Sequence, residues 1–150
     1  LYGKGEGVSN SKSIATRKAK MAVRVDFQSK QKSIVSQRVE DFAKETGEGA
    51  SAEVYLGFEE INTAIMEGAV ENWYEVNSTT VIERSVTADG TPKNMYRHYI
   101  LAAIDQAAAD KKLLEKIKRD KELKTAFEQT KAYDKMTADL ERYKEKLGDY

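Results

Sequence analysis

Between Ser11 and Lys44 the chain has no glycine and no proline, and small or apolar residues return at steps of three, four and seven. This stripe consists of Ala15, Ala19, Ala22, Val23, Phe27, Ile34, Val35, Val39 and Phe42. Such a period places the residues on one face of an α-helix. We therefore predict a long helix, with a cap from Ser9, Asn10 or Ser11 and a stop at Gly47.

The segment before this helix, "LYGKGEGVSNSKS", carries glycines at alternate positions. In a strand, alternate residues lie on the same face. A strand without side chains on that face allows the alanine-rich half of the next helix to approach closely. We predict a packing motif formed by Gly3, Gly5, Gly7, Ala15, Ala19 and Ala22.

The same glycines do not complete a nucleotide-binding motif. The dinucleotide fingerprint G-x-G-x-x-G is matched by Gly3 and Gly5, but Val8 stands at the third glycine. The P-loop pattern, which ends in Gly-Lys-Ser/Thr, is also absent. We predict no nucleotide site and no cofactor.

Three further segments follow the long helix. Val54, Phe58, Ile61 and Ile65 repeat at helical spacing up to Gly68, which indicates a second helix. From about residue 70 the composition changes to β-branched and aromatic residues, interrupted by the turn signal "ADGTP". We predict a β-hairpin with arms of about 73–86 and 95–104.

From Gln106 to Lys146 there is again no glycine or proline, which predicts one long helix or two helices in line, with a bend near 119–121. Apolar residues at steps of 3, 4, 3 and 4 form a narrow seam of the coiled-coil kind. The seam consists of Tyr133, Met136, Leu140, Tyr143 and Leu147. Two assignments stay open: packing on the body of the same chain, or an interface between copies.

Composition excludes several classes of site. The chain has no cysteine, so it has neither disulfides nor thiolate ligands, and its only histidine, His98, cannot build an ordinary zinc site or a catalytic triad. No apolar run is long enough to span a membrane. We expect no metal, no catalysis and no nucleic-acid binding.

The 25 basic and 25 acidic residues are unevenly placed. Residues 1–44 hold ten Lys or Arg against four Asp or Glu, whereas residues 45–83 hold nine Glu and no Lys or Arg. Such blocks can attract each other within a fold or between subunits, or can simply line separate solvated faces. The basic helix and the glutamate block are therefore a weaker candidate for a complementary pair.

The order of elements, together with "GKGEGVSNSKSIATRKAKMAVRVDF" and "NMYRHYILAAID", resembles the LPP20 lipoprotein family of bacterial envelopes. The G-x-G strand and the alanine steps of the family match Gly3, Gly5, Ala15 and Ala19, with Ala22 one residue short. A later strand of the family matches Tyr96, Tyr99, Ile100 and Leu101. The resemblance covers about residues 1–105.

This resemblance implies a domain of surface or outer-membrane lipoproteins, some of them associated with flagella, with no enzymatic activity assigned. The lipidated N-terminal cysteine of the family is absent here, and because Leu1 is not a natural start we expect a trimmed chain whose signal peptide and lipid anchor are missing. We expect location in the bacterial cell envelope, at the outer membrane or cell surface, on the periplasmic or extracellular side.

The expected fold class is α+β, with a small antiparallel sheet packed on the long helix and an extended C-terminal helix. We expect residues 1–105 to form an LPP20-like domain and residues 106–150 a helical extension. The expected function is structural assembly or protein–protein interaction, with copies of itself or other envelope proteins as partners. The alternative is an envelope module that binds a small molecule near Trp73, Tyr74 and Tyr96.

Overall fold

The computed structural model describes residues 1–148, apart from the side chains of Glu48 and Leu147. It has an α+β fold with a small antiparallel sheet and a long helix, which confirms the predicted class. Its elements are β1 (Tyr2–Ser9), α1 (Lys12–Thr46), a 3-10 turn (Gly47–Gly49), α2 (Ala52–Glu71), β2 (Tyr74–Val86), β3 (Pro92–Ala103), α3 (Gln106–Ile117), α4 (Lys121–Phe127) and α5 (Lys131–Gly148).

The chain divides into two compact units. This division differs from the expected one, in which a single boundary at residue 105 separates the two parts. Unit 1 consists of residues 1–30 and 72–104, and unit 2 of residues 31–71 and 105–150. The physical reason lies in the apolar stripe of α1. Its alanine half packs on the sheet, whereas its larger residues Val35 and Phe42 join the cores formed with the later helices.

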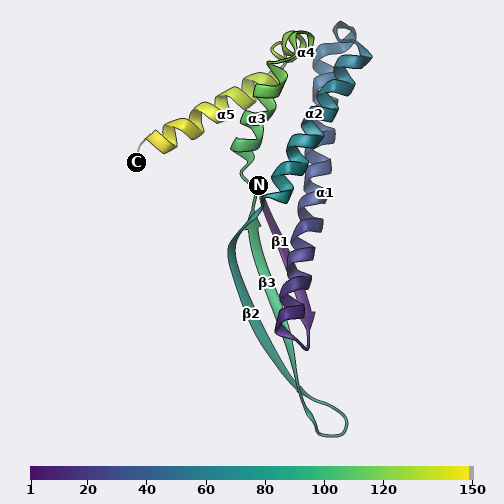
Figure 1. Ribbon diagram of the computed structural model, residues 1–150, viewed down its shortest axis with the longest axis vertical. Helices are drawn as coiled ribbons and strands as arrows, with labels where there is room; N and C mark the ends of the chain where they lie inside the picture. Colours follow the sequence, from purple (N-terminus) through teal and green to yellow (C-terminus); the bar gives the residue numbers. More distant parts are fainter. Residues whose placement is uncertain (149–150) are drawn as a thin grey trace. The chain divides into compact units, whose positions relative to one another are not determined.

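Unit 1 is a three-stranded antiparallel sheet of order β1-β3-β2 with the first part of α1 beside it (Figure 1). β3 is the central strand, and its Ile100 lies between Gly5 of β1 and Ser78 of β2. The turn between β2 and β3 has Gly90 at φ +85°, a left-handed conformation that favours glycine. The predicted hairpin and turn are therefore present.

The glycines of β1 lie directly against the backbone of α1. A Cβ added at Gly5 would be 2.1 Å from the carbonyl oxygen of Ala19, and one added at Gly7 would be 2.1 Å from that of Ala15. Gly3 faces the ring of Phe27, where a Cβ would be 2.7 Å from Cζ. The close approach inferred from the glycine and alanine spacing is thus a feature of the fold.

Unit 2 is helical and has an aromatic core. The rings of Phe42 and Phe58 stack with centroids 4.5 Å apart, and the ring of Phe127 is 5.3 Å from that of Phe58. Leu113 and Ile117 of α3 are buried in the same cluster. Helices that are distant in the sequence thereby share one apolar core.

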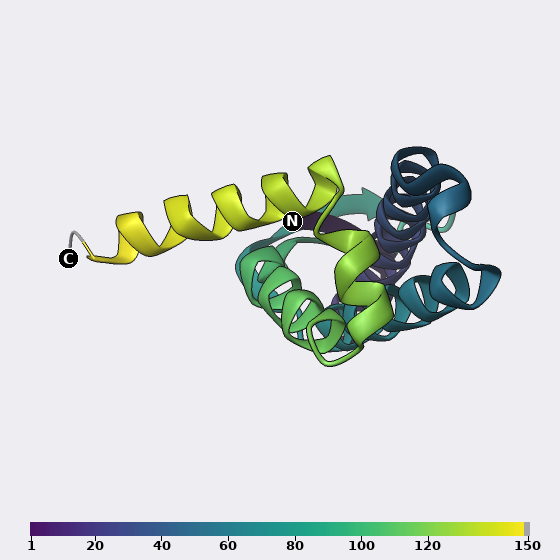
Figure 2. The same cartoon turned by 90° about the horizontal axis from the view of Figure 1, so that it is seen from above.

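The C-terminal segment is not one helix, nor two in line. It breaks near the predicted bend, where the side chain of Asp120 accepts hydrogen bonds from the amides of Glu122 and Leu123 and caps α4. A second break follows, where Thr130 Oγ1 accepts from the amide of Tyr133 at the start of α5. Figure 2 shows α5 extending away from α3 and α4. The expected extended helix is therefore three helices, because these polar side chains satisfy the helix ends.

Candidate interaction surface of the sheet

The outer edge of β1 is closed by side chains of α1. The amide of Lys4 donates to Asp26 Oδ2 at 2.9 Å, and Lys30 Nζ donates to the carbonyl of Tyr2 at 2.9 Å. Lys18 Nζ donates to the carbonyl of Val8 at 3.0 Å. Since these backbone groups already have partners, β1 offers little to a further strand.

Asp26 holds this edge as a carboxylate. Burial favours its neutral form, but the hydrogen bonds from Lys30 Nζ, at 2.7 Å, and from the Lys4 amide outweigh burial. Together they lower the pKa of Asp26 below its ordinary value of 3.8. The edge of β1 is therefore closed most firmly above that pH.

In the part of the chain that the structure describes, the outer edge of β2 is open, because no further strand pairs with it. Leu1 and Ile104 exchange both backbone hydrogen bonds, so in antiparallel alternation the even-numbered residues of β3 point their N–H and C=O groups at β1. The odd-numbered residues of β3 then point at β2, where they pair with Asn77, Thr79, Val81 and Glu83. The backbone groups of Ser78, Thr80, Ile82 and Arg84 consequently point outward.

The sheet also has a face that α1 does not cover. Gly3, Gly5 and Gly7 face α1, so their neighbours in β1 and the residues paired with those neighbours lie on the other face. Large apolar side chains of this face are exposed, namely Tyr2, Tyr74, Val81, Tyr99 and Leu101. A gathering of this kind on one face is typical of an interaction site.

Arg97 joins the three strands on this uncovered face. Its Nε donates to Glu83 Oε1 of β2 at 2.7 Å, and its Nη1 donates to Glu6 Oε1 of β1. The hydrogen bond from Arg97 lowers the pKa of Glu83, and the bonds to Glu83 and Glu6 raise the pKa of Arg97. The bridge joins one guanidinium to two carboxylates, so the exposed apolar side chains lie beside an ion-paired cluster of net charge −1.

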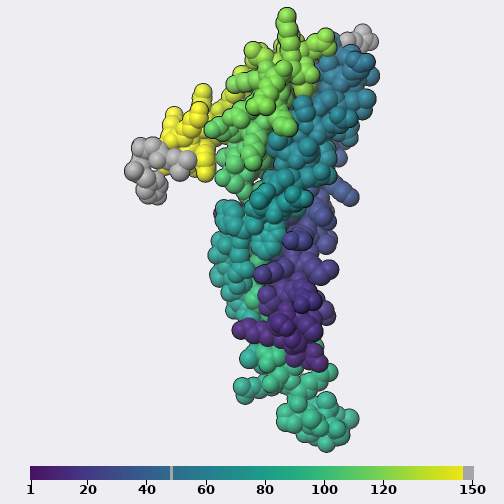
Figure 3. Space-filling model, in the orientation of Figure 1, coloured from purple at the N-terminus to yellow at the C-terminus, as the bar shows by residue number. Residues whose placement is uncertain are grey.

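The far end of the hairpin carries only two strands. β1 ends its pairing with β3 at Ser9 and Tyr96, whereas β2 and β3 continue to Val86 and Pro92. All residues from 81 to 94 are exposed, and the hairpin end is visible as a projecting finger in Figure 3. The open edge of β2 thus continues past the point where β1 ends.

Unit 1 contains a shallow depression of about 580 Å³. Tyr99 and Leu101 contribute to it, but it does not include Trp73, Tyr74 or Tyr96, where we expected a small molecule. Its remaining walls are Lys4, Gly5, Glu6, Ala22, Asn77, Ser78, Thr79 and Ile100. The expected set of three aromatic residues therefore does not form this depression.

The packing motif predicted from the glycines and alanines is brought together with one adjustment. Ala15 and Ala19 are fully buried, but Ala22 is only half-buried and Val23 takes the next inward position. The stripe thus proceeds in steps of four through 15, 19, 23 and 27. Ala22 instead lies at the flank, where it borders the depression.

The seam of α5 is divided along its length. Met136 is 7% exposed and belongs to the core of unit 2, and Tyr133 and Leu140 pack against that core. Tyr143 is 44% exposed, and the side chain of Leu147 lies outside the described residues. The first part of the seam therefore packs within its own chain, and among the described side chains of the seam Tyr143 remains available to a partner.

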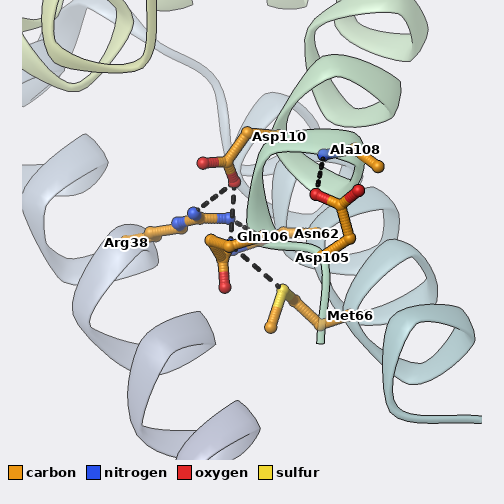
Figure 4. Close-up of polar contacts among 7 residues, drawn as sticks. All are labelled: Arg38, Asn62, Met66, Asp105, Gln106, Ala108 and Asp110. Atoms are coloured by element: carbon orange, nitrogen blue, oxygen red, sulfur yellow. Dashed lines mark hydrogen bonds and ion pairs between the residues drawn. The ribbon is translucent and has the colours of Figure 1, made fainter. Parts of the chain in front are cut away.

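The predicted complementary charge pair is not formed within the described residues: no ion pair there joins a basic residue of α1 to the glutamate block. Arg38 instead pairs with Asp110 of α3, with Nη2 to Oδ1 at 2.6 Å, and donates to Asn62 Oδ1 of α2 (Figure 4). Gln106 also donates to Asp110. This cluster connects three helices of unit 2, and residues so far apart could not be paired from the sequence.

His98 has a structural setting. It is buried on the α1 side of the sheet, and its Nδ1 shares a hydrogen bond of 2.7 Å with Thr80 Oγ1 of β2. Among the described residues, no group of three or more His, Cys, Asp or Glu could hold a metal ion. No helix in the part of the chain described has the length and apolarity needed to cross a membrane.

Comparison with known proteins identifies no relative. No family model, no curated protein and no solved structure matches the chain. The resemblance to the LPP20 lipoprotein family therefore stays a prediction.

Proposed function

We propose that this chain is a non-enzymatic domain of a bacterial envelope lipoprotein, located at the outer membrane or cell surface, that acts in structural assembly. Its expected partners are copies of itself or other envelope proteins, with membrane attachment through a lipid anchor. The envelope assignment depends on the family resemblance. The assembly assignment is supported by a feature of the described residues, the unequal protection of the two sheet edges.

This inequality favours assembly because exposed sheet edges are normally blunted. Edge strands attract other strands, and proteins counter this with charges, prolines, bulges or covering groups. β1 is capped by three side chains of α1. Among the described residues, the stretch of β2 from Asn77 to Ile82 carries no charge, proline or bulge, and the one register shift of the strand lies before it, between Glu75 and Asn77. A fold that closes one edge and leaves the other open is suited to adding a strand at the open one.

Light scattering of the purified chain tests the assembly function. We expect the mass to exceed the 16.9 kDa of one chain and to rise with concentration over the micromolar range. Addition of high salt should have little effect, since strand pairing uses backbone hydrogen bonds and not exposed ion pairs. A mass of one chain at every concentration would contradict self-assembly.

The envelope location needs a separate experiment on the product of the complete gene in its native cells. We expect incorporation of labelled palmitate and recovery in the outer-membrane fraction. Unlabelled protein recovered with the cytoplasmic fraction would overturn the envelope assignment and leave the assembly function to be judged by the mass measurement.

A small-molecule module is the second candidate, favoured by the depression beside Tyr99 and Leu101. Mass spectrometry of the denatured protein, purified from native cells, tests it. One small molecule per chain, released on denaturation and lost in Leu101→Asp, would support this alternative. Its absence from protein that assembles normally would exclude a tightly bound ligand.

A further inference from the structure

The residues along the open edge of β2 have a composition that suits pairing with a further strand. A bulge lies between Glu75 and Asn77, and beyond it, from Asn77 to Ile82, the strand contains no charged residue, no glycine and no proline. Four of these six residues are β-branched. Such residues fit the pleated surface of a sheet. The backbone groups that point outward from Ser78, Thr80, Ile82 and Arg84 supply the donors and acceptors.

We propose that this edge pairs with the β2 edge of a second copy, antiparallel and centred on Val81, so that two three-stranded sheets become one. The proposal rests on the assembly function and names its partner and surface. The occupant is a second copy because the edge is complementary to itself.

The register centred on Val81 matches side chains of like kind. Val81 of one copy lies opposite Val81 of the other, and Ile82 lies opposite Thr80, so β-branched residues meet across the junction. Glu83 and Arg84 lie opposite Thr79 and Ser78, whose hydroxyls can hydrogen-bond to them. No like charges stand opposite one another in this register.

The hydrogen-bonding pattern agrees with this register. The residues that point outward pair only with one another, Ser78 with Arg84 and Thr80 with Ile82, and each such pair exchanges two bonds. A register centred one residue later places Glu83 opposite Val81, which sets a carboxylate against an apolar side chain. The Val81 register avoids this mismatch.

Pairing of this kind also stops at two copies. A two-fold axis through Val81 uses the same edge on both copies, and the edges that remain belong to β1. Since Lys18, Asp26 and Lys30 of α1 already bond to outward backbone groups of β1, the two remaining edges of the joined sheet are less suited to adding a strand. The uncovered faces of the two copies then lie on the same side of the joined sheet and meet at Val81.

A cysteine at the centre of the junction tests this arrangement, because the natural chain contains none. Val81 would form a non-hydrogen-bonded pair with its copy, with Cα atoms about 4.5 Å apart. That separation lies within the range for a disulfide. Under mild oxidation, Val81→Cys should give a disulfide-linked dimer in high yield.

Ser85→Cys is the matched control, being exposed, on the same strand and on the same face. This variant should stay unlinked, since position 85 of one copy lies opposite Asn77 of the other copy and not opposite position 85. Equal linkage of both variants would overturn the proposal, as would a linked Ile82→Cys with unlinked Val81→Cys. If unmodified protein is dimeric but Val81→Cys stays unlinked, β2 pairing fails and the assembly function stands. If the unmodified protein and every variant are monomeric, β2 pairing and self-assembly both fail.

Discussion

At the scale of single residues, the glycines of β1 decide how closely strand and helix approach. The atoms nearest to an added Cβ at Gly5 and Gly7 belong to the backbone of α1, which cannot rotate away as a side chain can. The glycines are therefore required by the neighbouring helix and not by the conformation of their own backbone, since none of the three has a positive φ.

Gly5→Val should lower the free energy of unfolding by an amount near the upper end of the range of about 1–3 kcal/mol. The valine side chain would meet the backbone of Ala19 and Val23. Gly57→Ala in α2 is the control, since an added Cβ there meets nothing within 4 Å and alanine favours a helix by about 0.5–1 kcal/mol. Thermal unfolding followed by circular dichroism measures both. Equal melting of Gly5→Val and the natural protein would show that the close approach is not needed.

Asp26 gives the β1 edge a pH dependence. Its folded pKa is lowered, so it contributes stability above its unfolded value of 3.8, and this contribution is lost as pH falls through the lowered pKa. Unfolding free energies should therefore fall more steeply between about pH 5 and pH 2 for the natural protein than for Asp26→Asn. Parallel pH profiles for the two proteins would show that this carboxylate does not stabilise the fold.

At the scale of elements, α5 shows what periodicity alone leaves open. Its seam of Tyr133, Met136, Leu140 and Tyr143 has one spacing throughout, yet Met136 is in the core and Tyr143 is exposed. Spacing identifies a face, but the partner of that face depends on where the preceding breaks direct the helix. Those breaks depend on polar caps at Asp120 and Thr130.

Met136→Ala should lower the free energy of unfolding by about 2–5 kcal/mol, because it removes a buried side chain from the core around Phe42 and Phe127. Tyr143→Ala is the control on the same seam and should change it by no more than about 0.5 kcal/mol. Chemical denaturation measures both. If the two variants lose equal stability, α5 does not pack on its own chain as described.

The sequence predicted the class of each element better than its partners. The strand, the long helix and the hairpin follow from glycine alternation, the helical stripe and the Asp89-Gly90 turn, which are all local signals. The division into units does not follow locally. It depends on Phe42 meeting Phe58 and Phe127, and on Arg38 meeting Asp110, which are contacts between distant segments.

At the scale of the whole molecule, the candidate interaction surface could not be predicted from short-range sequence patterns. Alternation identified the hairpin, but an edge is open only if nothing else in the fold covers it. The position of α1 beside the sheet decides which edge is covered. It allows Lys18, Asp26 and Lys30 to bond to the edge of β1 and leaves the edge of β2 open. The same helix also carries Arg17, Lys20 and Arg24. The sequence of charges along α1 therefore does not show which residues bond to the strand edge and which are solvated.

Residue-resolved amide hydrogen exchange, measured at low and at high protein concentration, tests the open edge most directly. At low concentration, protection along β2 should alternate, with slow exchange at Thr79 and Val81 and fast exchange at Thr80 and Ile82. At concentrations where light scattering shows two copies, Thr80 and Ile82 should become protected as well. Fast exchange of these two amides in a demonstrated dimer would contradict the account.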